Sequence, residues 1–440
     1  MKHPQKKWRP NQRLRCRLMG HTPGQVVVQI TDRCNARCPQ CSMRVSNRFH
    51  RKTLDKQTLY KIIDAAGKKK IKAISFTGGE PLLMLDDLCD YINRAGANHI
   101  PFIRTGTNGF LFTHSCHPGF KDKISRLAQT LSATPLGNFW ISMDSSDSET
   151  HETMRGLKGV VSGIQKAIPI FHDAGLFPSV NLGINRNLGG DLTRSLDPRD
   201  FSPQDYGKAV YKTYAKAFSL FYQTVIDLGF TIVNVCYPMS VETGSSDLKA
   251  VYKASTTDTI VAYTREEKQM IFMALRDTIP KFRDQIRIFS PLTALNALVD
   301  QYGNTPRITS PCQGGINYFF IDAQTGDTFP CGFRGQENFG KFWRMNRAGH
   351  PLAPDCRQCD WECFRDPSEL SAPILDLLST PLSFAQRLGS NPGFLRIWAN
   401  DLVYYRACHY FNGRKAPDYS RLKRFSPSNY KKTLTGCLFS

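Results

Sequence analysis

Short apolar segments alternate with longer segments of helical spacing along the first half of the chain. Six apolar segments predict strands, over residues 25–30, 71–76, 101–104, 139–143, 179–184 and 231–236. Between them, apolar residues recur every three or four positions, which predicts helices over residues 54–66, 86–94, 160–174 and 206–228. Strands that alternate with helices predict an α/β fold of parallel β/α units. Six such units predict a partial (β/α)6 barrel of the TIM type.

The second half of the chain has a different pattern. Residues 321–329 predict a β-hairpin that turns at Gly326. Helical spacing returns near the C-terminus, over residues 370–378, 384–388 and 394–409. We expect an inserted loop over residues 187–205, which are rich in Gly, Asp, Pro and Ser. The predicted organisation is a basic arm, a core barrel, a helical connection, a small cysteine-rich domain and a helical basic extension, over residues 1–24, 25–240, 241–310, 311–365 and 366–440.

Composition places the chain among globular proteins and adds a strong positive charge. Of 440 residues, 41% are hydrophobic and 22% are charged, and the formal net charge is +21. No stretch approaches the ~20 apolar residues that cross a bilayer, and no apolar segment follows the basic N-terminus as in a secretory signal. These features predict a cytoplasmic protein. The basic ends are either solvated tails or a match for an anionic partner: the inner membrane surface, an acidic substrate or nucleic acid.

The fourteen cysteines include two groups that are close in sequence. In a reducing cytosol, clustered cysteines bind metal more often than they form disulfides. Cys34, Cys38 and Cys41 follow the first predicted strand with C-x3-C-x2-C spacing. Three thiolates in one loop can ligate three irons of a [4Fe–4S] cluster and leave the fourth iron open. The alternative is a zinc knuckle that a distant ligand completes.

Distinctive motifs also follow the next predicted strands, where parallel β/α folds place their chemistry. Two adjacent glycines let the backbone approach a ligand closely, and a glutamate beside them can accept hydrogen bonds from an ammonium group. The motifs are Gly78-Gly79-Glu80-Pro81 after the second strand, Thr107-Asn108-Gly109 after the third, and Ser142-Met143-Asp144 at the end of the fourth.

With these motifs in this order, residues 25–240 resemble the radical S-adenosylmethionine (SAM) superfamily. The resemblance implies that the three cysteines hold a [4Fe–4S] cluster whose open iron binds SAM. It also implies a one-electron reductant of the flavodoxin or ferredoxin type, and cleavage of SAM to methionine and a 5′-deoxyadenosyl radical that abstracts hydrogen from a substrate. The chain departs from the family at Gln40, where an aromatic residue usually precedes the third cysteine and packs near the adenine.

The same resemblance assigns further residues to SAM. The Gly-Gly-Glu-Pro motif would hold the SAM amino group, and the Thr-Asn-Gly motif would line the site beneath it. Ser142 on the fourth strand would contact the ribose or the carboxylate of SAM, and Arg155 after that strand would reach the carboxylate. Asn181 on the fifth strand would contact the ribose hydroxyls. For Ser142, Arg155 and Asn181 a structural role is an equal alternative. The expected SAM site comprises Gly78, Gly79, Glu80, Pro81, Thr107, Asn108, Ser142, Asp144, Arg155 and Asn181.

The second group of cysteines begins with Cys312, and Gly326 and Cys331 follow it at the spacing C-x13-G-x4-C. This spacing resembles the opening of the SPASM and twitch extensions of radical SAM enzymes. The local cysteines are fewer than a full SPASM domain has, so we expect one auxiliary [4Fe–4S] cluster that assists substrate binding or electron transfer. A structural zinc ribbon is the alternative. The expected ligands are Cys312, Cys331, Cys356 and either Cys359 or Cys363.

The sequence therefore predicts a radical SAM enzyme of oxidoreductase or transferase type, whose substrate is a peptide, a lipid or a small metabolite. The competing hypothesis is a nucleic-acid-binding protein that contains zinc or an iron–sulfur cluster and has no SAM chemistry. It explains the charge and the cysteines, but not the motifs at successive strand ends. Nucleic acid is therefore the less favoured partner.

Overall fold

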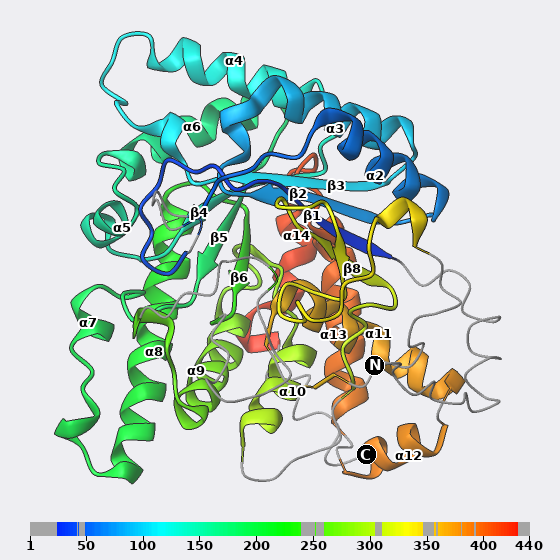
Figure 1. The fold of residues 1–440 in the computed structure, drawn as a ribbon. Helices are drawn as coiled ribbons and strands as arrows, with labels where there is room; N and C mark the ends of the chain where they lie inside the picture. The colour runs from blue at the N-terminus through cyan, green and yellow to red at the C-terminus, as the bar shows by residue number, and fades with distance from the viewer. Residues whose placement is uncertain are drawn as a thin grey trace.

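The computed structural model describes residues 24–41, 43, 49–238, 251, 259–303, 310–345, 356–357, 360–379, 381–390 and 393–429. A nine-stranded sheet organises this part of the chain (Figure 1). Its strands are β1 Gln25–Thr31, β2 Ala73–Gly78, β3 Phe102–Thr107, β4 Asn138–Met143, β5 Ser179–Gly183, β6 Ile232–Cys236, β7 Arg287–Ile288, β8 Tyr318–Ile321 and β9 Thr328–Phe329.

The order of the strands is β7-β6-β5-β4-β3-β2-β1-β8-β9. All neighbouring strands run parallel except β8 and β9, which form an antiparallel hairpin. The predicted partial barrel is confirmed, because the six expected strands are present as β1–β6 and the sheet does not close on itself. The prediction missed β7 at one edge, and the hairpin extends the other edge by pairing with β1.

Helices cover the outside of the curved sheet (Figure 1). Those in the barrel are α2 Lys56–Lys68, α3 Leu85–Ala97, α4 Phe120–Ser132, α5 Ser148–Arg155, α6 Val160–Asp173, α7 Asp191–Arg194 and α8 Pro203–Asp227. Their apolar faces and the strands form one large buried core. The expected loop at 187–205 instead contains α7 and the first turn of α8, which begins where Ser202 caps the backbone N–H of Asp205.

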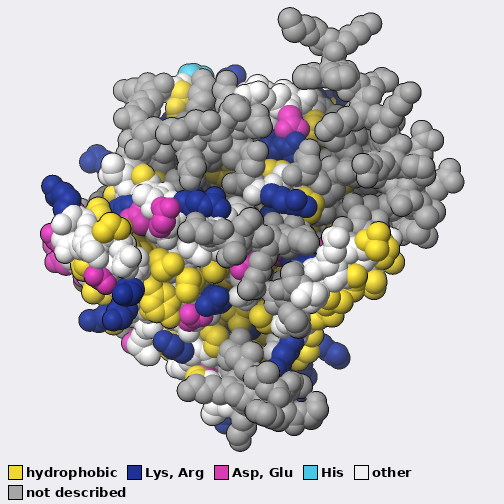
Figure 2. All heavy atoms as spheres, turned by 90° about the horizontal axis from the view of Figure 1, so that it is seen from below, with side chains coloured by type: hydrophobic (Ala, Val, Ile, Leu, Met, Phe, Trp, Pro, Cys, Tyr) yellow, Lys and Arg dark blue, Asp and Glu magenta, His cyan; other side chains and the backbone are white. Residues whose placement is uncertain are grey.

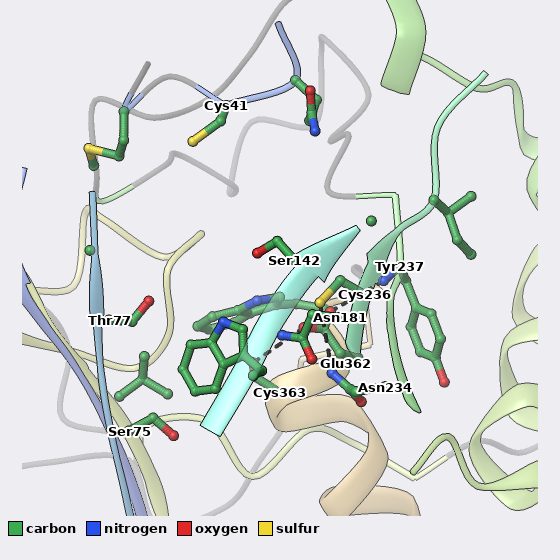
Figure 3. A pocket seen from close by; sticks show the side chains of 18 of the residues that line it. Cys41, Ser75, Thr77, Ser142, Asn181, Asn234, Cys236, Tyr237, Glu362 and Cys363 are labelled. Carbon is green, nitrogen blue, oxygen red and sulfur yellow. Dashed lines mark hydrogen bonds between the residues drawn. The ribbon is translucent and has the colours of Figure 1, made fainter. Parts of the chain in front are cut away.

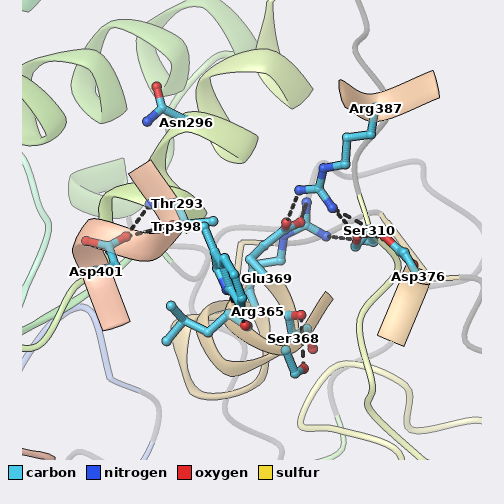
Figure 4. A network of polar contacts seen from close by, with 12 residues as sticks. Thr293, Asn296, Ser310, Arg365, Ser368, Glu369, Asp376, Arg387, Trp398 and Asp401 are labelled. Atoms are coloured by element: carbon cyan, nitrogen blue, oxygen red, sulfur yellow. Dashed lines mark hydrogen bonds and ion pairs between the residues drawn. The ribbon is translucent and has the colours of Figure 1, made fainter. Parts of the chain in front are cut away.

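The later helices are α9 Arg265–Thr278, α10 Leu292–Tyr302, α11 Glu362–Ser379, α12 Pro381–Ser390, α13 Phe394–Ala407 and α14 Tyr419–Leu422. Buried ion pairs fix them in place (Figure 4). Glu369 forms an ion pair with Arg365 at 3.0 Å within α11. It also accepts a hydrogen bond from Arg387 at 2.8 Å, which joins α11 to α12. Asp401 on α13 pairs with Arg283 at 2.7 Å, so the C-terminal helices are packed against the segment before β7.

Apolar side chains remain exposed on α11 and α12, among them Leu378 (58%) and Leu382 (80%). From below the molecule, hydrophobic side chains are seen beside scattered basic ones (Figure 2). Within the described ranges, no helix is both long and apolar enough to cross a membrane. The basic arm at 1–23 and the last residues, 430–440, lie outside the description.

Candidate active site

A cavity of about 350 Å³ lies on the concave side of the sheet. Alternate residues of β1–β6 line it, because side chains of a strand point to opposite faces in turn. Strand register places Ser142, Asn181 and Asn234 side by side on β4, β5 and β6, so a polar row crosses the cavity wall (Figure 3). Arg104 and Trp140 line the same wall, with the guanidinium carbon 5.7 Å from the centre of the indole ring.

The cysteine loop lies above this wall, and Cys41 lines the cavity. Cys38 is buried, and Cys34 and Cys41 are half-buried. Burial raises the pKa of all three thiols, that of Cys38 to about 12, and the charges of the three act on one another. The positive charge of Arg155 lowers each of these pKa values but only partly offsets the effect of burial.

The Gly-Gly-Glu-Pro motif is packed against the backbone of the cysteine loop. The backbone N–H of Gly79 donates to the carbonyl of Thr31 at 2.7 Å, and that of Glu80 to Arg33 at 2.8 Å. A Cβ on Gly78 would lie 2.2 Å from the Thr31 oxygen, and one on Gly79 would lie 2.0 Å from the Arg33 oxygen. The sequence interpretation assigned both glycines to the SAM site. Their close backbone approach is to the protein's own chain, and Gly78 also lines the cavity.

The Glu80 side chain is fully buried and joins two motifs. Its carboxylate accepts from the backbone N–H of Leu82 at 3.0 Å and of Asn108 at 2.6 Å, and burial raises its pKa to about 7. Asn108 in turn donates to Asn35 at 2.8 Å and to the Cys34 sulfur at 3.7 Å. The Thr-Asn-Gly motif is therefore connected to the cysteine loop. A carboxylate has about four lone pairs, so Glu80 can still accept from a ligand's ammonium group.

Gln40, where the chain departs from its family, has a partner of its own. Its side-chain amide donates to Asp144 at 2.8 Å, and the same carboxylate oxygen receives Arg155 at 2.8 Å. Both members of this ion pair are buried. The backbone N–H of Asp144 donates to Nδ1 of His151 at 3.1 Å, and burial keeps the pKa of that imidazole well below 6.5. A polar network thus occupies the place expected for an aromatic contact.

The cavity offers unsatisfied polar atoms that a polar ligand could use. Oε1 of Gln40, Nε of Arg155 and Oδ1 of Asn181 are buried and have no hydrogen-bond partner among the described residues. All three residues line the cavity. Buried polar atoms are rarely left without a partner, so these three fit a ligand with donors and acceptors, such as the ribose, amine and carboxylate of SAM.

The expected SAM residues are thus divided between the cavity and the wall behind the cysteine loop. Gly78, Ser142, Asp144, Arg155 and Asn181 line the cavity itself. Of the remaining five, Thr107 and Asn108 lie at the end of β3. Gly79, Glu80 and Pro81 lie on the loop after β2, where Pro81 opens a short helix, Pro81–Met84, that Glu80 caps. Among the described side chains, no three His, Cys, Asp or Glu groups converge on a site for a single metal ion.

A second, small cavity is lined by Cys312, Cys331 and Cys356. The hairpin β8–β9 joins the first two along the chain, and the backbone N–H of Cys312 donates to the carbonyl of Cys356 at 2.8 Å. The sulfurs of Cys312 and Cys331 accept from the backbone N–H groups of Gly314 and Phe333, both at 3.4 Å. Hydrogen bonds of this kind surround the sulfur ligands of iron–sulfur clusters and tune their potentials.

Of the two candidates for a fourth ligand, Cys363 does not line this small cavity. It is the second residue of α11 and lines the large cavity instead, together with Cys236, Glu362 and Asn234 (Figure 3). Cys359 lies outside the described residues. Sequence reasoning also missed Arg104, which no motif marks. Cys236 had a signal, because it ends the sixth strand, as the other motifs end earlier ones.

Comparison with known proteins relates part of the chain to a known family. Residues 28–186 match the family model of the Radical SAM superfamily. The aligned part of a GTP 3′,8-cyclase from Listeria monocytogenes is 31% identical over 165 residues, which is 36% of this chain and 44% of that protein. A probable GTP 3′,8-cyclase from Methanococcus maripaludis is 28% identical over 146 residues, 32% of this chain and 45% of that protein. The chain thus spans less than half of either relative.

Solved structures with a similar fold include SuiB of Streptococcus suis bound to S-adenosylmethionine. It has a TM-score of 0.47 and 14% identity, and the match covers 74% of this chain and 66% of that one. Native anSMEcpe with bound AdoMet has a TM-score of 0.48 and 14% identity, over 86% of this chain and 99% of that one. The matched segment of our chain is a radical SAM domain, a family that binds a [4Fe–4S] cluster and SAM.

Proposed function

We propose that the chain is a radical SAM enzyme in which Cys34, Cys38 and Cys41 hold the cluster that binds SAM. When bound, the cluster and SAM supply reductive cleavage to methionine and a 5′-deoxyadenosyl radical. The observation that carries the proposal is the continuity between the cysteine loop and the cavity, since Cys41 lines the cavity and Arg155 lies against both.

The protein's own residues would bind and orient SAM. Glu80 is fixed by two backbone donors and faces the loop of Cys34, so its free lone pairs are available to the ammonium group of methionine. The unsatisfied Nε of Arg155 suits the carboxylate, and Asn181 suits the ribose hydroxyls. Gln40 would position Asp144 and Arg155, and its free Oε1 can accept from the adenine amino group.

The second site supports an auxiliary [4Fe–4S] cluster on Cys312, Cys331 and Cys356, with Cys359 as the fourth ligand. Three thiols already line one cavity, and backbone donors point to two of the sulfurs. Of the two candidates that the sequence left open, we favour Cys359 over Cys363, because Cys363 lines the large cavity. This cluster would lie beside the substrate space, because Trp361 lines both cavities.

The substrate of this chain is a molecule whose polar part enters the cavity. Asn234, at the end of the polar row beyond the residues assigned to SAM, supplies hydrogen bonds, and Arg104 supplies a positive charge that contacts aromatic rings. These groups favour a small metabolite or the polar end of a larger substrate over an apolar chain. A flavodoxin- or ferredoxin-type protein remains the expected reductant, and contact of the basic ends with an anionic membrane surface remains a prediction.

Anaerobic reconstitution tests the proposal. We expect the holoprotein to contain about eight irons per chain if both sites fill, and to produce 5′-deoxyadenosine from SAM on reduction. Cys34→Ala should abolish 5′-deoxyadenosine and remove about half of the iron, since three thiolates hold the first cluster. Cys89→Ala, on the outer helix α3, is the matched control and should behave as the parent. Unchanged iron in Cys34→Ala, or no 5′-deoxyadenosine from the parent, contradicts the proposal.

A further inference from the structure

Two thiols that neither cluster needs lie in the large cavity. Cys236 ends β6, and Cys363 lies in the first turn of α11, so separate parts of the fold bring them together. Both are hydrogen-bonded to the carboxylate of Glu362, with the sulfur of Cys363 3.3 Å from its Oε1 (Figure 3). This pair of cysteines and its carboxylate share a wall with the polar row of β4–β6.

Both cysteines are held in the protonated form. Burial, together with the negative charge of Glu362, raises the pKa of each thiol well above 9, and the more weakly acting charge of Arg104 does not reverse this. Among the described residues the groups that face the pair are therefore Glu362 and Arg104, with Asp366 one turn further along α11. A protonated cysteine carries an S–H bond, which a thiolate lacks.

An S–H bond inside a radical enzyme's cavity has a chemical consequence. It is weaker than the C–H bond of most alkyl groups, so a carbon radical takes its hydrogen atom in a downhill step. The hydroxyl groups that line the cavity, such as Ser75, Thr77 and Ser142, have stronger O–H bonds. The phenol of Tyr237 has a weak O–H bond, but that group is buried against Asp366, to which it donates at 3.1 Å.

We propose that Cys236 and Cys363 are the hydrogen-atom donors of this cavity and deliver a solvent-exchangeable hydrogen to a carbon radical formed there. The proposal rests on the proposed function, which supplies the radical. The S–H bond breaks homolytically, the new C–H bond forms at the radical carbon, and a thiyl radical remains on sulfur. One electron from the low-potential protein reductant and one proton from water restore the thiol.

A cavity with such donors suits reactions in which one hydrogen atom is removed from the substrate and another is returned to a carbon radical, without net oxidation of the substrate. Inversion of a stereocentre, or closure of a ring or a carbon–carbon bond that ends in hydrogen gain, belongs to this class. Glu362 is a positioning residue here, because its carboxylate is hydrogen-bonded to both thiols and orients them.

Turnover in D2O without added substrate tests the donors directly. Thiols exchange to S–D, carbon-bound hydrogens of the protein do not, and the 5′-deoxyadenosyl radical is then the carbon radical in the cavity. Titanium(III) citrate serves as a reductant free of thiols. We expect the parent holoprotein to form 5′-deoxyadenosine that carries one deuterium, measured by mass spectrometry as a fraction of the product formed and therefore independent of the rate.

The double variant Cys236→Ser, Cys363→Ser should lose this deuterium. Serine can keep the hydrogen bond to Glu362, so the variant should retain any purely structural role of the cysteines. Its O–H bond is too strong to give a hydrogen atom to a carbon radical. The two single variants identify the donor, iron content checks that each variant holds its clusters, and Cys89→Ser should label as the parent does. Labelling at the parental level in the double variant, or unlabelled 5′-deoxyadenosine from the parent, overturns the proposal. Absence of 5′-deoxyadenosine in every protein contradicts the proposed function itself.

Discussion

The two groups of cysteines are assembled in opposite ways. Cys34, Cys38 and Cys41 lie within eight residues, on one loop that backbone hydrogen bonds hold against the Gly-Gly-Glu-Pro motif. Cys312, Cys331 and Cys356 come from three separate segments, which meet because β8 pairs with β1 and α11 packs over the hairpin. Local geometry thus determines the first group, whereas tertiary packing determines the second.

This difference has a consequence for stability. The first group depends on a close backbone contact, so an added methyl group should disturb it even though no polar group is lost. The second depends on the helices that enclose it, so a change in their buried ion pairs should weaken it at a distance. Variants in the two regions should therefore separate the iron content of the two sites.

The largest effect is expected from Glu369→Ala. The change leaves Arg365 and Arg387 without the carboxylate that both of them contact inside the protein (Figure 4). Breaking a buried ion pair costs about 3–5 kcal/mol. We expect a loss of this size in the free energy of unfolding by urea. Iron should be lost first from the second site, because α11 carries Phe364, which lines that site and packs against Trp361.

The exposed Glu149 on α5 provides the control for this variant. Glu149→Ala removes a solvated carboxylate and should change the free energy of unfolding by less than about 0.5 kcal/mol. The iron at each site is measured by the visible absorption of one cluster at a time, with Glu369→Ala placed in the Cys34→Ala and Cys331→Ala backgrounds. Equal loss of iron at the two sites would show that the regions are not independent.

The next effect is expected from Gly79→Ala, which acts on the first group. The new Cβ would lie 2.0 Å from the carbonyl oxygen of Arg33, and a backbone atom cannot rotate away as a side chain can. Overpacking of this kind costs about 1–3 kcal/mol. We expect the first site to lose most of its iron while the second retains it. Gly389→Ala on α12, where nothing lies within 4 Å of the added Cβ, should leave both sites intact.

The sequence predicted the first region far better than the second, and the contrast above explains why. Strand periodicity and the motif after each strand identified β1–β6 and the cysteine loop, because these depend on neighbours in sequence. Nothing local distinguishes Cys359 from Cys363. The position of Cys363 in the wall of the large cavity follows from the packing of α11, which no local pattern predicts. Arg104 was missed for the same reason, since only the pairing of β3 with β4 brings its guanidinium near the Trp140 ring.

The smallest effect is a pH dependence that belongs to the first region. His151 is buried, its Nδ1 accepts from the backbone of Asp144, and burial and the charge of Arg155 hold its pKa well below 6.5. Below about pH 6.5 the imidazole of His151 is therefore protonated in the unfolded chain but stays neutral in the folded chain until the pH falls further. The contribution of His151 to stability is complete above about pH 6.5 and falls by about 1.4 kcal/mol per pH unit below it.

His151→Asn keeps an acceptor for the Asp144 amide and removes the titrating group. We expect the parent to lose more stability than this variant between about pH 7 and about pH 5, as measured by urea unfolding. In the described part of the second region, residues 310–345, 356–357 and 360–379, there is no histidine, and burial raises the pKa of Glu362 and Asp366. Acid protonates these two carboxyl groups, and their raised pKa means that protonation stabilises the folded state around α11. As the pH falls, hydrogen exchange should therefore show α5, which carries His151, opening before α11. Parallel pH profiles for parent and variant would show instead that the imidazole is protonated in the folded protein.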